Sequence, residues 1–247
     1  MENTPQLATP TPEDPIETLT GSALERLGTA LVAVAKRPSR AAYATWMRVV
    51  EPGWIVPLVI TAVCLGMLDS VISVCVRTLL TTPGSGSPHY LFGAPSLRDW
   101  IVNGLVANPA LGLLSLAVTV YAVALLTPAE RGSLNGRAFQ VARPYLLAQI
   151  VVSGINIVIG EPAFALGLTP LGQDSLLGLV VIALNLAVGL YALIASLNAL
   201  AAGSGRGRLL IFCVVGLVAA AAFLIVWIGL GALFSLVGIH LPIPIFW

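Results

Sequence analysis

Charged residues are scarce in this sequence. They make up 9% of the 247 residues, whereas a soluble domain usually carries about a quarter. Apolar residues account for 57%, and the mean hydropathy is +0.96. So few charges could not cover a surface that faces water, which excludes an ordinary soluble domain. Lipid is the solvent that fits this composition.

Strong net charge, cysteine pairs and histidine clusters are also missing. The formal net charge is +1, so the sequence predicts no nucleic-acid partner. Cys64, Cys75 and Cys213 lie in apolar runs without a CxxC pair, as small core hydrophobes do. His89 and His240 are isolated, with no partner at metal-ligand spacing. With no Ser-His-Asp or Cys-His set either, we expect no metal, no cofactor and no enzymatic activity.

The N-terminal region divides into a polar tail and a helical stretch. Residues 1–20 are rich in proline and threonine, so we expect a disordered cytoplasmic tail and no signal peptide. Residues 21–50 predict amphipathic helices divided by Pro38. Apolar residues recur there at helical spacing, namely Leu24, Leu27, Leu31 and Val34, then Tyr43, Trp46, Met47 and Val50. Such a basic, aromatic helix lies in the membrane interface or packs on the protein's own cytoplasmic side.

Five apolar stretches follow. A membrane-spanning helix needs about 20 apolar residues, and every backbone polar group in lipid must be satisfied within its segment. The sequence therefore predicts an all-α integral membrane bundle of five transmembrane helices over residues 51–239, with a short outer tail at 240–247. The predicted spans are Trp54–Val76, Ile101–Thr127 with its start set by Pro109, Pro144–Gly160, Ser175–Ala202 and Leu209–Ile239.

The basic residues predict the orientation of these spans. Arginine and lysine concentrate in cytoplasmic loops. Ten of the twelve precede the first span or lie in the second and fourth connections, and the other two, Arg77 and Arg98, lie in the first outer loop. The expected topology has a cytoplasmic N-terminus, five crossings and an outer C-terminus. The sequence from Gly203 to Arg208 predicts a tight turn between the last two helices, because its three glycines permit a sharp reversal.

Polar residues inside the spans are the candidate functional residues. Asp69 stands out, because a carboxylate deep in a membrane helix is costly. It is either hydrogen-bonded to a neighbouring helix or part of a transport path. A stripe of small and polar residues on the fourth span and a polar face on the third favour helix packing over a ligand site. The candidate intramembrane polar site comprises Asp69, Ser73, Arg77, Gln149, Asn156 and Asn185. The Glu161-Pro162 pair predicts the end of the third span.

The layout resembles the Yip family, named for Ypt/Rab-interacting proteins, over roughly residues 40–237. The likeness is local in Val49-Val50-Glu51-Pro52-Gly53-Trp54-Ile55-Val56-Pro57, a proline-punctuated helix entry, and in Tyr191 through Phe212. The resemblance implies a cytoplasmic N-terminal region, five closely packed helices and a short outer C-terminus. The Asp-Leu-Tyr-Gly-Pro motif of eukaryotic members is absent, so the resemblance implies architecture rather than vesicle traffic. Arginine outnumbers lysine eleven to one, which favours a bacterial protein of the cytoplasmic (inner) membrane.

Three functions remain open at the level of the sequence. The first is a non-enzymatic scaffold that binds the lipid bilayer and other membrane proteins, or associates with itself. The second is a small transporter or channel with a polar path around Asp69, although five spans cannot divide into equal inverted repeats. The third is an accessory subunit of a larger membrane complex.

Overall fold

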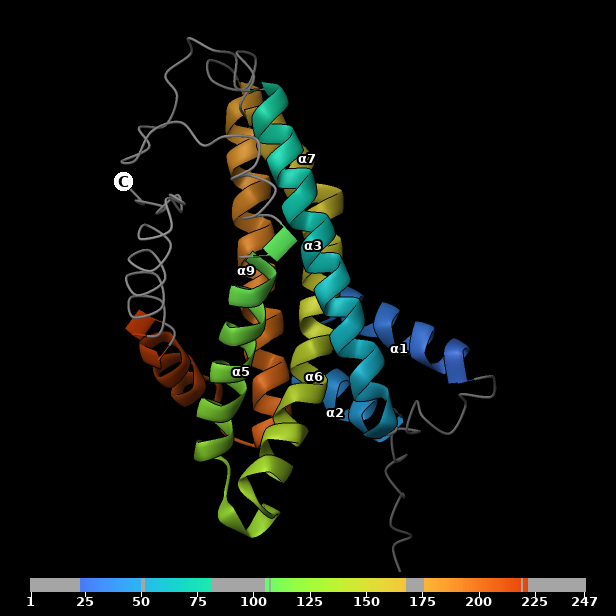
Figure 1. The fold of residues 1–247 in the computed structure, drawn as a ribbon, viewed down its shortest axis with the longest axis vertical. Coiled ribbons are helices and arrows are strands. Elements are labelled where there is room, and N and C mark those ends of the chain that lie inside the picture. Colours follow the sequence, from blue (N-terminus) through green and yellow to red (C-terminus); the bar gives the residue numbers. More distant parts are fainter. Residues whose placement is uncertain are drawn as a thin grey trace, which may run out of the picture.

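The computed structural model describes residues 23–49, 52–80, 105–106, 108–167, 176–218 and 220–221. Within these ranges every regular element is a helix (Figure 1). The predicted disordered tail at 1–20, the outer tail at 240–247 and most of the fifth predicted span lie outside the described residues. The helices are α1 (Ala23–Lys36), α2 (Arg40–Val49), α3 (Ile55–Leu80), α5 (Asn108–Leu126), α6 (Leu134–Ile155), α7 (Glu161–Gly167) and α9 (Leu176–Ser204), then a helical segment over Arg208–Val218.

Three helical stretches are long and apolar enough to cross a membrane. They are Ile55–Ser73 in α3, the continuous stretch Leu134–Gly167, and Leu176–Ser204. The apolar part of α5, Gly112–Leu126, and the segment Arg208–Val218 are shorter. The described residues thus contain three full-length spans where five were predicted. The first and fourth predicted spans agree with α3 and α9 to within a few residues at each end.

The third predicted span is longer than expected at both ends. It was predicted to run from Pro144 to Gly160, but α6 begins ten residues earlier and continues through a π-helical turn at Asn156–Gly160 into α7. Pro144 is buried inside α6, and its ring lies against Gly203 of α9. The prediction that Glu161 and Pro162 end the helix was wrong. Pro162 follows directly on the π-helical turn, in which the Glu161 N–H bonds Asn156 O five residues back, so the missing N–H of the proline falls where the hydrogen-bond register shifts.

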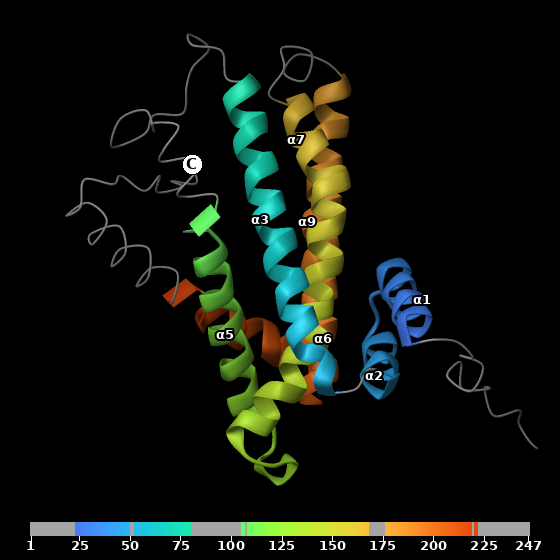
Figure 2. The same ribbon diagram turned by 45° about the vertical axis from the view of Figure 1, so that its right-hand side comes forward.

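α6 lies at the centre of the bundle and contacts α3, α5 and α9 (Figure 2). Its backbone approaches that of α9 closely at Gly203, where an added Cβ would lie 2.7 Å from Val141 Cα and 2.8 Å from the Gln140 carbonyl oxygen. The missing side chain at this position therefore lets the two backbones touch, as small residues do in membrane helix pairs.

The aromatic face of α2 packs on the bundle. Tyr43 and Trp46 are 0% and 1% exposed, and α2 contacts α6 and α9. Three side chains of the bundle bind backbone carbonyls of the α1–α2 hairpin. Tyr191 Oη donates to Ala35 O at 3.0 Å, Asn198 Nδ2 to Pro38 O at 2.6 Å, and Arg143 Nη2 to Met47 O at 3.0 Å. These carbonyls lie at or just beyond the C-terminal ends of α1 and α2, where intrahelical donors run out.

Arginines hold the C-terminal end of α5 in the same manner. Arg137 Nη1 donates to Ala124 O at 3.2 Å and to Thr127 O at 2.6 Å, while Arg206 Nε donates to Leu126 O at 2.7 Å. Cations favour the negative end of a helix dipole, so these contacts fix where α5 stops.

The predicted tight turn after the fourth span is confirmed. α9 ends at Ser204, Gly205 has a φ of 71° that favours glycine, and the next helix begins at Arg208. The α1–α2 hairpin, the 127–133 connection and the 205–207 turn all lie toward the same end of the bundle, which we call the basic end (Figures 1 and 2).

Candidate functional site

Asp69 and Asn156 are hydrogen-bonded to each other. Asn156 Nδ2, in the π-helical turn, donates to Asp69 Oδ1 on α3 at 2.9 Å. Both residues are half-buried. Two of the six predicted site residues, 87 positions apart in sequence, thus meet between two helices. An amide donor stabilises a carboxylate that hydrocarbon alone would make costly.

The π-helical turn shapes the surroundings of this pair. A π-turn adds one residue to the helix and re-aims the side chains around it. The Asn156 carboxamide lies against Gly160, so closely that a methyl group at Gly160 would overlap its Oδ1. Glu161, a second acidic residue of the intramembrane region, is buried directly after the turn. Gly160 and Glu161 therefore belong to the same local arrangement as Asn156.

Gln149 connects α6 to α9. Its Nε2 lies 3.4 Å from Ser196 Oγ, a long hydrogen bond between the polar face of the third predicted span and the stripe on the fourth. Asn185, on the same stripe as Ser196, donates instead to Val181 O of its own helix at 3.1 Å. The structure does not bring Asn185 to the Asp69 pair by any hydrogen bond of its described side chain.

Ser73 and Arg77 follow Asp69 on α3. Ser73 is half-buried one turn beyond Asp69. Arg77 lies in the last turns of α3, and its side chain falls outside the described part of the molecule. The candidate site thus consists of one hydrogen-bonded pair, Asp69 and Asn156. Gln149 lies on α6, about two helical turns before Asn156 in the chain.

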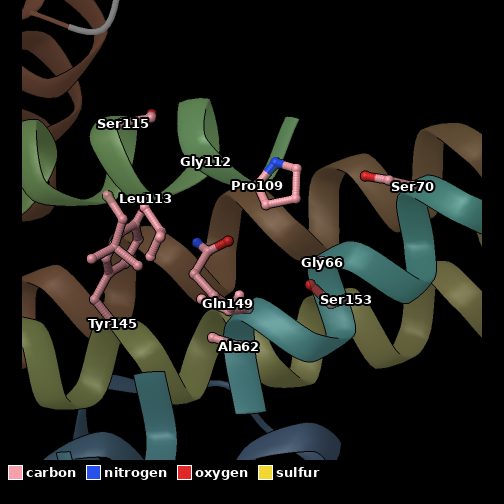
Figure 3. A pocket seen from close by; sticks show the side chains of 12 residues that line it. Ala62, Gly66, Ser70, Pro109, Gly112, Leu113, Ser115, Tyr145, Gln149 and Ser153 are labelled. Atoms are coloured by element: carbon pink, nitrogen blue, oxygen red, sulfur yellow. The ribbon is translucent and has the colours of Figure 1, made fainter. Parts of the chain in front are cut away.

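A cavity of about 270 Å³ lies between α3, α5 and α6 (Figure 3). Ser70, next to Asp69, contributes to its wall, as do Gln149 and Ser153 from α6. The carboxamide of Gln149 points into the space between α3 and α5 (Figure 3). Tyr145, which is hydrogen-bonded to Thr119 of α5, lines the same cavity. Among the lining residues none is ionisable at neutral pH.

Sequence reasoning missed the residues that fasten the basic end. Tyr191 and Asn198 recur at a spacing of seven on α9, so they share one face, and both reach the α1–α2 hairpin. The seven-residue spacing was a usable signal, but which carbonyls the two side chains reach depends on how the hairpin docks. Arg137, Arg143 and Arg206 were read only as topology markers, whereas each also binds a backbone carbonyl.

The contacts that the described residues make at this site are hydrogen bonds between side chains on different helices. In the residues that the structure describes, no three His, Cys, Asp or Glu side chains gather closely enough to hold a metal ion. The hydrogen-bonding groups at the site are amides, hydroxyls and carboxylates on facing helices. Comparison with models of protein families, with curated proteins and with solved structures found no match to this chain.

Proposed function

We propose that this chain is a non-enzymatic multi-pass membrane protein that acts as a scaffold, binding other membrane components within the bilayer. The observation that carries the proposal is the engagement of its intramembrane polar side chains with one another. Asn156 binds Asp69 across two helices, and Gln149 binds Ser196 across another two. Polar groups used in this way fasten helices together.

The proposed topology has five crossings, a cytoplasmic N-terminus and an outer C-terminus in the bacterial cytoplasmic membrane. The common location of the basic segments supports it, since α3 and α6 begin, and α5 and α9 end, toward the basic end (Figure 2). Positive charge favours the cytoplasmic side. The cytoplasmic N-terminal region, five closely packed helices and short outer C-terminus that the resemblance to the Yip family implies belong to the same proposal, with the lipid bilayer and other membrane proteins as partners.

Co-purification tests the scaffold directly. The full chain, carrying an affinity tag, is extracted in a mild detergent and its companions are identified by mass spectrometry. We expect a defined partner, recovered in constant ratio, from both the wild type and Asp69→Asn, because asparagine can still bond Asn156. Recovery of the chain alone from cross-linked membranes, where weak complexes also survive, would contradict the proposal.

A small transporter or channel is the second candidate function. Ser70, the residue after Asp69, lines the cavity together with Gln149 and Ser153, and π-turns often occur at functional sites. Transport would need the charge of Asp69, which the scaffold does not. Flux measured in proteoliposomes that is abolished by Asp69→Asn, in protein whose thermal unfolding is unchanged, would favour transport. An accessory subunit of a larger complex would instead co-purify at fixed stoichiometry with cofactor-bearing partners.

A further inference from the structure

The cavity between α3, α5 and α6 has an uncharged polar wall. Hydroxyl groups come from Ser70 and Ser153, and a carboxamide comes from Gln149. Gln149 has two N–H donors and one acceptor oxygen, and one of those donors makes the long bond to Ser196. Its group aims into the cavity (Figure 3). Neutral donors and acceptors in an apolar protein mark a place where a ligand with matching groups gains hydrogen bonds.

Small residues on α3 and α5 leave this space open. Ala62 and Gly66 line it from α3, and Gly112 lines it from α5. A Cβ built at Gly66 or at Gly112 meets no atom within 4 Å. A methyl group can therefore be added at either position without a clash, and since both glycines line the cavity, both are sites at which bulk can be introduced experimentally.

The cavity wall that α5 contributes is partly exposed. Gly112, Leu113 and Ser115 are exposed, and α5 is one of the apolar helices of the chain. Because such a helix faces hydrocarbon in a membrane, a ligand would enter from the lipid phase. The volume of about 270 Å³ equals roughly nine water molecules at ~30 Å³ each. It accommodates about ten non-hydrogen atoms, enough for the head of a lipid-soluble molecule but not for its chains.

We propose that this cavity binds the uncharged, oxygen-bearing head of a molecule dissolved in the bilayer, with its apolar chain leaving beside α5. Carbonyl, ester or hydroxyl oxygens match the Gln149 amide and the serine hydroxyls. A charged head fits poorly, because the lining offers no counter-charge and burying an unpaired charge is costly. Two sources carry the matching chemistry, a neutral glycerolipid and a lipid-borne quinone.

The test uses the purified full chain in detergent with three short-chain probes, of which the two glycerolipids carry the same apolar chains. They are dioctanoylglycerol, a decyl-substituted benzoquinone and, as the charged comparator, dioctanoyl phosphatidylglycerol. Binding is followed by the shift in thermal unfolding midpoint and by titration. Gly112→Leu adds bulk at a residue that lines the cavity, and Gly189→Leu is its matched control, an exposed glycine of α9 whose added Cβ also meets nothing within 4 Å.

Gln149 is tested separately, because its substitution also breaks the bond to α9. Gln149→Leu should weaken binding about fivefold, the effect of one hydrogen bond. Ser196→Ala removes the same interhelix bond but leaves the amide in the cavity, so it should bind as the wild type does.

The expected result is a midpoint increase for one neutral probe in the wild type and in Gly189→Leu, with a loss of at least tenfold in affinity in Gly112→Leu. The neutral probe that binds shows whether the natural ligand is a glycerolipid or a quinone. Three results would overturn the proposal: no shift with either neutral probe, an equal shift with the charged probe, or equal shifts in Gly112→Leu and the wild type.

Discussion

The hydrogen bond from Asn156 to Asp69 reduces the cost of placing the Asp69 carboxylate among apolar helices. An intramembrane carboxylate needs a donor, and the amide supplies one at 2.9 Å. Gly160 makes room for that amide, since any side chain there would displace it. The same contact thus explains why an aspartate, an asparagine and a glycine occupy positions 69, 156 and 160.

Asn156→Leu should lower the free energy of unfolding by about 1 kcal/mol, because measured interhelix hydrogen bonds in membranes average ~0.6 and reach ~1.7 kcal/mol. Unfolding in detergent mixtures of increasing denaturing strength provides the measurement. Asn185→Leu is the control, since that amide bonds within its own helix. Equal losses in the two variants would mean that the Asp69 contact contributes nothing specific.

Gly203→Ala should destabilise the chain by about 1–3 kcal/mol, the usual cost of overpacking. The added methyl group would lie 2.7 Å from Val141 Cα, which is backbone and cannot rotate away. Gly189→Ala, into open space, should be neutral or slightly stabilising in the same unfolding assay. A neutral Gly203→Ala variant would show that α6 and α9 lie farther apart than described.

Asp69, Gln149 and Asn156 could be selected from sequence because polar residues are rare in apolar runs. The residues that they contact on other helices could not be predicted from the sequence. Helical spacing gives the face on which a side chain lies, but the partner on another helix depends on rotation and crossing of both. Glu161 was dismissed as a helix stop, since the proline after it concealed a π-turn that sequence spacing does not reveal.

At the level of elements, helix ends at the basic end are bound by side chains from other helices. Arg137 illustrates this, since it binds two carbonyls where α5 finishes. Arg137→Gln should fray that end by removing a charge-assisted contact of about 1.5–3 kcal/mol, reduced by the partial exposure of the side chain. Faster amide hydrogen exchange over residues 123–127 is the expected observation. Arg208→Gln, at an exposed position of the next helix, should leave that exchange unchanged.

The docking of α2 should depend on pH through Tyr43. Burial raises the pKa of the Tyr43 hydroxyl above its usual 10.0, and the neighbouring Tyr191 raises it further. Below pH 10 the phenol is neutral whether α2 is docked or free. As pH rises above that value the free form ionises first, so stability falls with increasing pH.

Tyr43→Phe should remove this part of the alkaline sensitivity. Among the described residues nothing hydrogen-bonds the buried Tyr43 hydroxyl, so the variant should also be at least as stable as the wild type at pH 8. Thermal unfolding midpoints at pH 8 and pH 11 make the comparison. An identical alkaline drop in both proteins would show that Tyr43 does not titrate with docking.

The element boundaries show where sequence reasoning works. α3 and α9 were predicted closely because uninterrupted apolar runs define them. The stretch Leu134–Gly167 was predicted too short, because Arg143 and Pro144 resemble a boundary in sequence. In the structure Arg143 reaches the α2 carbonyl of Met47 and Pro144 packs among helices, so neither ends α6.

At the scale of the whole molecule, composition alone indicated a helical membrane protein, and three helices of sufficient length and apolarity agree with it. The number of crossings and their direction rest on charge asymmetry. The basic segments meet at one end of the bundle (Figure 1), as a single cytoplasmic face requires.

The central claim is that hydrocarbon surrounds the helices and that the basic end faces the cytoplasm. Reporters fused to the two ends of the full chain test it most directly, one active only in the cytoplasm and one active only outside. The account predicts that the N-terminal fusion is active with the cytoplasmic reporter and the C-terminal fusion with the outer reporter. Activity of both ends on the same side of the membrane would contradict the topology of five crossings.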